Sequence, residues 1–226
     1  YISYLYTIPN RKQRLEKITS IFRLAELWEK QVYELSAGQL TRINLAKAFG
    51  MTSLGDPNQY GLTFVLGGGE VRLLDLTSAY SIFANDGIKN IPTGILEVDD
   101  GQGNILERYS PRPSRVLPEN IARDVSGMLS SASARFPEYP LNSPLAIPGY
   151  DVAVKTGTTN DTRDAWVIGY SPSIAIGLWT GNNDNSKMTK SVAGFIAAPL
   201  WNEVMTYAVS KYPKTYFNTP EAISPN

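Results

Sequence analysis

The chain has 226 residues, 42% of them hydrophobic, enough for one sizeable domain or two small ones. Its 21 Lys and Arg balance its 21 Asp and Glu, so no basic field favours nucleic acid. Cysteine and histidine are both absent, which excludes disulfides, thiolate metal sites and histidine-dependent catalysis within the chain. We therefore expect no metal site, no cofactor and no nucleic-acid partner. Without a run of about 18 apolar residues, we also expect no membrane span.

Apolar residues recur at helical spacing in four segments of the first 135 residues. The predicted helices cover residues 11–32, 39–49, 73–85 and 118–131. Two glycine signals, Gly50 and Asp86-Gly87, mark the ends of the second and third helices. Between the third and fourth helices, residues 95–98 and 105–108 flank a glycine-rich turn, as the strands of a β-hairpin do.

Strand patterns dominate the second half of the chain. After a proline-rich loop at 136–149, three short strands are predicted at 151–156, 165–170 and 174–180, followed by a closing helix at 195–209. Connections this short predict antiparallel pairing. The sequence therefore favours an α+β fold, in which an antiparallel sheet is flanked by helices.

The stretch Lys155-Thr156-Gly157-Thr158-Thr159 points most directly to chemistry. Lys-Thr-Gly is one of three motifs of enzymes that acylate an active-site serine. On an exposed strand edge, Gly157 would let a peptide backbone approach closely for main-chain pairing. Lys155 could attract a substrate carboxylate, to which Thr158 could donate its hydroxyl. For the tripeptide alone, a strand that ends in a threonine-rich turn is the simpler explanation.

The other two motifs of such enzymes are missing from this chain. No serine has a lysine three positions later, and the only Ser-x-Asn is Ser224-Pro225-Asn226 at the C-terminus. Because the nucleophile and its base act as a unit, we predict no catalytic residue within the chain. The motif would form one wall of an active site and align a ligand there.

Around this motif, over residues 49–226, the chain resembles the transpeptidase domain of class A penicillin-binding proteins, the enzymes that cross-link peptidoglycan. The matching segments keep the family's order and approximate spacing. They are Tyr60–Thr63, Leu66–Val71, Leu73–Tyr80, Phe83–Asn85, Val154–Asn160, Asp164–Trp166, Gly169–Pro172, Trp179–Asn182 and Ala197–Trp201.

This resemblance implies an incomplete penicillin-binding or β-lactamase-like fold, in which Lys155, Thr156, Gly157, Thr158 and Thr159 line the acyl-donor site. It also implies that the ligand is a peptidoglycan stem peptide or a β-lactam. The location would be the cell envelope, at the outer face of the cytoplasmic membrane, where full-length members are anchored.

Residues 1–48 resemble another family, the signature-motif segment of ABC transporter ATPases, through Leu35-Ser36-Ala37-Gly38-Gln39 and its flanking helix. A serine hydroxyl and a glycine amide at a helix N-terminus can bind a γ-phosphate, which makes Ser36, Gly38 and Gln39 candidate nucleotide contacts. For the pentapeptide alone, an ordinary helix capped by Ser36 is the favoured explanation, and it is the flanking match that favours the ABC family. Gly-x-x-x-x-Gly-Lys-Ser/Thr does not occur, so the chain cannot be a complete ATPase.

We therefore expect two parts, a helical ABC-like segment at 1–48, which would be cytoplasmic, and a partial transpeptidase domain at 49–226, joined at a seam between Leu40 and Gly50. A natural fusion, a misassembled reading frame and a designed chimera all fit such a seam. The expected function is that of a D,D-transpeptidase fragment, inactive by itself because its serine lies outside the chain. The alternatives are a non-catalytic binder of D-Ala-D-Ala peptides or β-lactams, and an ABC transporter ATP-binding fragment.

Overall fold

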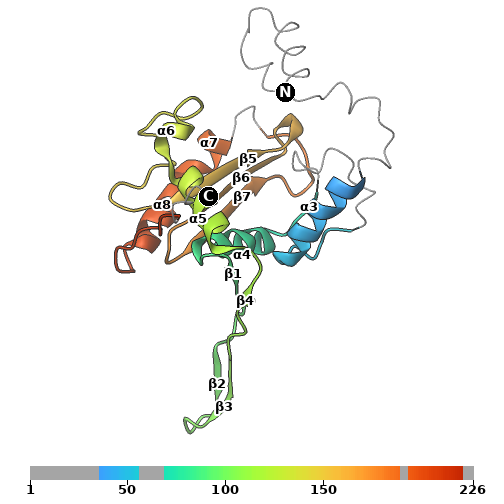
Figure 1. Ribbon diagram of the computed structural model, residues 1–226, viewed down its shortest axis with the longest axis vertical. Helices are drawn as coiled ribbons and strands as arrows, with labels where there is room; N and C mark the ends of the chain where they lie inside the picture. The colour runs from blue at the N-terminus through green and yellow to red at the C-terminus, as the bar shows by residue number, and fades with distance from the viewer. Residues whose placement is uncertain (1–35, 56–68, 189–192, 221–226) are drawn as a thin grey trace, which may run out of the picture.

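The computed structural model describes residues 36–55, 69–188 and 193–220, and Figure 1 shows their arrangement. An antiparallel sheet lies at the centre, with helices packed against both of its faces. The predicted α+β class is confirmed. The predicted helix at 11–32 lies outside the described residues.

The central sheet consists of β5 (Ala153–Thr158), β6 (Asp164–Tyr170) and β7 (Ala175–Gly181), in that order. All three pair antiparallel, and their ends fall within two residues of the predicted strands. Because β5 runs on to Thr158, the whole Lys-Thr-Gly-Thr sequence belongs to the strand. A 3-10 turn, Asn160–Thr162, leads from β5 into β6.

One face of the sheet packs on α7 (Ala193–Ile196) and α8 (Ala198–Val209). The prediction of one continuous helix at 195–209 is wrong, because the helix breaks at Ala197. Pro199, at the start of α8, has no N–H to donate to the carbonyl four residues earlier. The hydrophobic core between the sheet and α8 contains Val152, Val154, Ala165, Val167, Ala197, Ala198, Trp201, Met205 and Val209.

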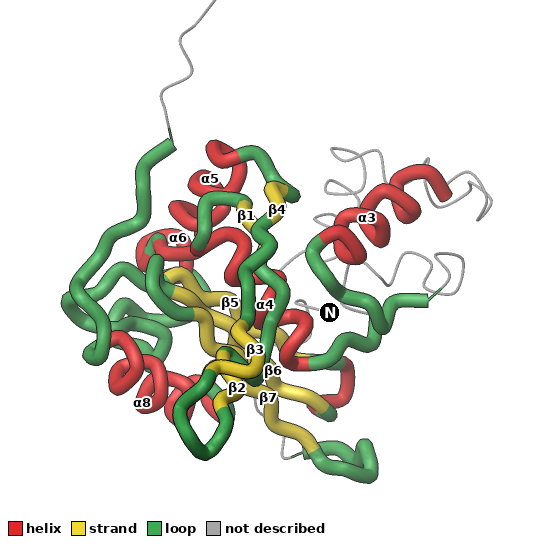
Figure 2. The backbone as a smooth tube through the Cα atoms, turned by 90° about the horizontal axis from the view of Figure 1, so that it is seen from below, coloured by secondary structure: helices red, strands yellow, loops and turns green. Residues whose placement is uncertain are grey.

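The opposite face packs on α4 (Leu73–Ala84) and α5 (Glu119–Ser130), which confirms both predicted helices to within two residues at either end. At the far end of β6, the hydroxyl of buried Tyr170 lies 3.1 Å from Ser126 Oγ of α5. The Tyr170 ring also stacks on Phe83 of α4, at 6.4 Å between centroids. Figure 2 shows α8 and the α4–α5 pair on different sides of the sheet.

The helix predicted at 39–49 is confirmed as α3 (Ser36–Ala48). Its residue Ile43 is fully buried, and the ring of Phe49 meets that of Phe83 edge-on at 5.7 Å. Gly50 ends the helix at a φ of 106°, a conformation that favours glycine, and donates its N–H to Lys47 O. Phe49, directly after α3, therefore connects the end of this helix to α4 by packing on Ala79 and Ile82.

A narrow antiparallel arm projects from this body (Figure 1). Its base pairs β1 (Ile88–Lys89) with β4 (Ser114–Arg115), and its tip pairs β2 (Glu97–Asp99) with β3 (Ile105–Arg108). The tip confirms the predicted hairpin, whereas β1 and β4 are too short to leave a periodic signal. A single turn of helix, α6 (Ala132–Arg135), precedes the proline-rich loop. Among the described helices, none is long and apolar enough to cross a membrane.

Candidate functional site

Strand β5 places Lys155 to Thr158 at an edge of the described sheet, because β6 is its only strand neighbour there. Side chains alternate between the two faces of a strand. Val154 packs in the α8 core, so Thr156 and Thr158 share the α8 face, while Lys155 and Gly157 share the α4 face. The outer edge of β5 can therefore pair with an extended ligand, with Lys155 and Thr158 projecting on opposite sides of it.

The two side chains at the start of the motif have different surroundings. Lys155 is exposed, and its Nζ donates a hydrogen bond to the Thr156 carbonyl oxygen at 2.6 Å. The half-buried Thr156 hydroxyl lies 3.2 Å from the hydroxyl of Tyr139. Tyr139 comes from the proline-rich loop, and its place beside the motif has no signal in the local sequence. Thr156 is therefore fixed from within the protein, whereas Lys155 faces solvent.

Gly157 is a glycine that the fold itself does not need. A Cβ at this position would meet the Trp166 Cβ at 3.6 Å, an ordinary van der Waals contact. By contrast, a Cβ at Gly169 would come 2.2 Å from Trp201, and one at Gly177 would come 2.0 Å from Thr77. Packing within the chain thus explains Gly169 and Gly177, whereas close approach of a ligand backbone would explain Gly157.

Thr159, at the end of the motif, is bonded to Asp164 on the neighbouring strand. The Thr159 hydroxyl donates to Asp164 Oδ2 and accepts from the Asp164 N–H, each at 2.8 Å. The indole N–H of Trp179 donates to the other carboxylate oxygen, Oδ1, at 2.9 Å. Sequence reasoning did not assign a role to Asp164 or Trp179, because only the strand register brings them together.

An open depression lies on the same face of the sheet as Lys155. It is lined by residues of α4 and β7, namely Leu73, Leu74, Thr77, Ala175, Ile176 and Gly177. Leu74 of this set is 64% exposed, and nearby Trp179 is 36% exposed. This depression is therefore open and largely apolar, and it lies at the β7 edge of the sheet, opposite to β5.

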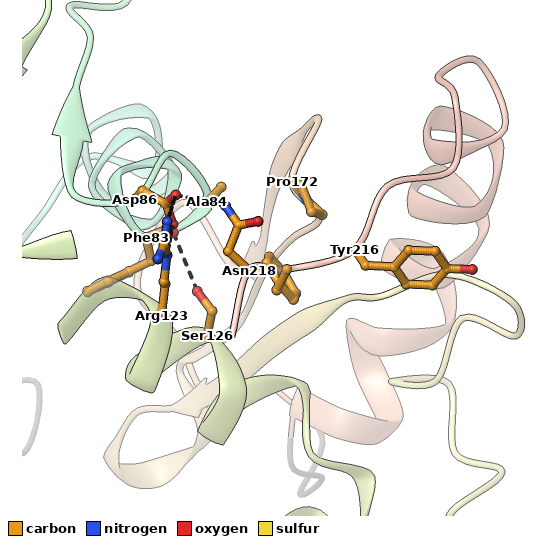
Figure 3. A pocket seen from close by; sticks show the side chains of 9 residues that line it. Phe83, Ala84, Asp86, Arg123, Ser126, Pro172, Tyr216 and Asn218 are labelled. Carbon is orange, nitrogen blue, oxygen red and sulfur yellow. Dashed lines mark hydrogen bonds and ion pairs between the residues drawn. The ribbon is translucent and has the colours of Figure 1, made fainter. Parts of the chain in front are cut away.

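A second, smaller cavity of about 30 Å³ lies at the other end of β6, between α4, α5 and the C-terminal segment (Figure 3). Arg123 pairs there with Asp86 through Nη2 and Oδ2 at 2.9 Å, and its hydrogen bonds hold the pKa of Asp86 below the ordinary value. The cavity adjoins Tyr170, six residues along β6 from Asp164, or about 20 Å. Its lining includes no residue of β5, and its Asp86–Arg123 ion pair joins α5 to the turn after α4, so we assign the cavity a structural role.

The family model for the penicillin binding protein transpeptidase domain matches residues 34–206. Penicillin-binding protein 1A of Aquifex aeolicus is 34% identical over 163 residues, which are 70% of this chain and 21% of that protein. Penicillin-binding protein 2D of Bacillus subtilis is 30% identical over 190 residues, 80% of this chain and 26% of that protein. The chain therefore spans about a fifth to a quarter of the curated relatives' length.

Solved structures show the same fold. The penicillin-binding protein PonA1 from Mycobacterium tuberculosis gives a TM-score of 0.70 at 22% identity, covering 85% of this chain and 55% of that one. The structure of PonA1 from the same organism in complex with penicillin V gives a TM-score of 0.67 at 23% identity, covering 79% of this chain and 52% of that one.

The ABC transporter resemblance finds no support in these comparisons. The family match begins at residue 34 and thus includes Ser36, Gly38 and Gln39, whose side chains lie outside the described residues. Helix α3 runs unbroken from Leu40 to Ala48, across most of the predicted seam. The division at 48/49 remains a prediction.

Proposed function

This chain belongs to the penicillin-binding protein transpeptidase domain family, and on that premise we propose that it forms the acyl-donor wall of a D,D-transpeptidase site. The observation that carries the proposal is the placement of Lys155 to Thr158 on the edge strand β5, with a glycine at 157 that internal packing does not require. The serine nucleophile is supplied from outside this chain.

In this proposal, β5 holds a stem peptide in extended form by main-chain hydrogen bonds. Lys155 attracts the terminal carboxylate, and the exposed Thr158 side chain donates to it. The external serine oxygen attacks the carbonyl carbon of the penultimate D-alanine, and the terminal D-alanine leaves as the protonated amine. An acceptor amine then attacks the acyl-enzyme, which re-forms the serine hydroxyl and completes the cross-link. The described residues contribute alignment to both steps.

A reversible binding function is the second candidate. It is favoured by the absence of any Ser-x-x-Lys from the sequence, since the ligand-aligning strand is present without the nucleophile. Acting alone, the chain would then bind D-Ala-D-Ala peptides or β-lactams without forming a covalent bond. We place this activity at the outer face of the cytoplasmic membrane, where peptidoglycan is the partner.

Calorimetric titration with penicillin V and with an N-acyl D-Ala-D-Ala peptide tests the proposal. We expect both compounds to bind reversibly with measurable heat. After incubation with a fluorescent penicillin, denaturing electrophoresis should show no covalently labelled band. The Gly157→Ala variant should bind about tenfold more weakly, because its methyl group enters the space of the ligand backbone. Gly101→Ala, where an added Cβ meets nothing within 4 Å, is the matched control.

Two results would contradict the proposal. A covalent band would show that the chain contains its own nucleophile. Absence of heat with both compounds, from a chain that unfolds cooperatively, would show that β5 does not bind the acyl donor.

A further inference from the structure

We propose that Asp164 is a positioning residue, which fixes the end of β5 for carboxylate recognition by Thr158 and reserves the Thr159 hydroxyl for that structural role. The inference rests on the proposed function, because it concerns the same strand. Asp164 would act entirely through Thr159 and Trp179, without touching the ligand.

The Thr159 hydroxyl donates its proton within the protein and not to a ligand. A threonine hydroxyl has one proton to donate, and here it goes to Asp164 Oδ2 at 2.8 Å. The same oxygen accepts the Asp164 N–H at 2.8 Å, and the Thr159 N–H donates to the Asp164 carbonyl oxygen at 3.1 Å. Three hydrogen bonds thus join these two residues directly after Thr158.

The other oxygen of the Asp164 carboxylate also accepts a hydrogen bond. The Trp179 indole N–H donates to Oδ1 at 2.9 Å, so one carboxylate links the ends of β5, β6 and β7. The Trp179 ring packs on the Trp166 ring, with 6.4 Å between centroids. Gly181 leaves room for it, since a Cβ there would come 2.4 Å from Trp179 Cζ2. Both carboxylate oxygens are therefore satisfied by donors that packing holds in place.

The turn between Thr159 and Asp164 adopts an unfavourable backbone conformation. Asp161 and Thr162 have φ angles of 63° and 55°, in the left-handed region that non-glycine residues rarely occupy. Two contacts from the loop after β7 hold this turn in place. Lys187 forms an ion pair with Asp161 at 3.1 Å, and the Met188 N–H donates to the Thr162 carbonyl oxygen at 3.0 Å. Strain of this kind persists only where surrounding contacts fix it, and it concentrates at ligand sites.

These contacts fix Thr158 at its C-terminal side, where β5 would otherwise fray. Misplacement of a recognition group by about 1 Å can reduce activity a hundredfold. Asp164 thus determines how precisely Thr158 is positioned to bind the ligand carboxylate. The alternative is that Asp164 only stabilises the fold, in which case ligands with and without a carboxylate would be affected equally.

The experiment compares penicillin V with its methyl ester by calorimetric titration. We expect Asp164→Ala to weaken binding of the acid about tenfold and binding of the ester much less. Asp164→Asn should stay within about threefold of the original chain, because its amide oxygen still accepts from Trp179 and its amide N–H₂ can donate to Thr159. Thr159→Val should act as Asp164→Ala does, and Thr159→Ser should restore binding. Asp99→Ala, on the exposed arm, is the matched control.

Amide hydrogen exchange supplies a readout that does not need a ligand. Asp164→Ala should raise exchange at the Thr158 and Thr159 amides about tenfold and leave exchange in α8 unchanged. If the original chain binds neither compound, the proposed function fails, and exchange still decides the role of Asp164. Unchanged exchange at Thr159, or an equal loss of acid and ester binding, would overturn the inference. If Asp164→Ala does not fold, the same two criteria apply to Thr159→Val.

Discussion

Trp201 of α8 lies directly against the backbone of Gly169 in β6. A Cβ at residue 169 would come 2.2 Å from Trp201 Cζ2 and 2.9 Å from the Ala153 carbonyl oxygen. The Trp201 ring is fully buried, and its indole N–H donates to the Ile176 carbonyl oxygen at 3.1 Å. The absence of a side chain at Gly169 therefore sets how closely α8 approaches the sheet that carries β5.

We expect Gly169→Ala to lower the free energy of unfolding by about 1–3 kcal/mol or more, because the methyl group overpacks the core against Trp201. Urea unfolding followed by tryptophan fluorescence measures the change. Gly157→Ala is the internal control and should change stability by less than about 0.5 kcal/mol, since its Cβ makes only an ordinary contact. Equal losses in the two variants would contradict this account of the sheet–helix contact.

Alkaline pH should destabilise the protein through Tyr170. Burial raises the pKa of Tyr170 from 10.0 to about 12. The stability that this group contributes is therefore complete below pH 10 and is lost as the pH rises from 10 towards 12. Tyr170→Phe should flatten that part of the stability profile, whereas Tyr212→Phe, at an exposed site, should leave it unchanged. Thermal unfolding between pH 9 and about 12 checks this, and identical profiles for all three proteins would refute it.

Low pH should destabilise the protein through Asp86, which lines the small cavity in Figure 3. Arg123 hydrogen bonds lower the Asp86 pKa from 3.8, so the stabilisation is complete above that pH and is lost as the pH falls through the lower, folded value. Asp86→Asn should cost about 1–2 kcal/mol at pH 7 and flatten the acid limb. Asparagine tolerates the φ of 48° at this position, so backbone strain should not confuse the result.

Urea unfolding from pH 2 to 7 measures the Asp86 effect. Asp99→Asn on the exposed arm is the control and should behave as the original chain does. An acid limb that is equally steep in Asp86→Asn would show that the Arg123–Asp86 pair does not couple stability to pH.

The projecting arm should contribute little to the stability of the body. Leu96 and Leu106 are 69% and 67% exposed, so Leu96→Ser and Leu106→Ser should each change the unfolding free energy by less than about 0.5 kcal/mol. Met205→Ala, at a fully buried site of α8, should cost about 2–5 kcal/mol. The comparison uses urea unfolding of the three variants, and a loss above about 2 kcal/mol in either arm variant would contradict it.

Elements with a strong period could be predicted from the sequence. The apolar spacing in α4 and α5, and the turn residues that bound β6 and β7, come from local chemistry that needs no knowledge of the fold. The sequence does not reveal the break at Ala197, although it contains Pro199, because apolar residues continue at helical spacing on both sides of the break. The β1–β4 pair cannot be predicted, because strands of two residues show no period.

The sequence by itself determined the motif, its family and its missing serine, since these depend on residue identity and spacing alone. Only the tertiary structure decided how the motif residues differ in role. Strand register brings Asp164 and Trp179 to Thr159, and a distant loop brings Tyr139 to Thr156. The tertiary structure also distinguishes Gly157 from Gly169. A Cβ at residue 157 would make only an ordinary van der Waals contact, whereas one at residue 169 would collide with the Trp201 indole ring. The physical reason is that hydrogen bonds and van der Waals contacts act over a few ångströms in space, whatever the separation along the chain.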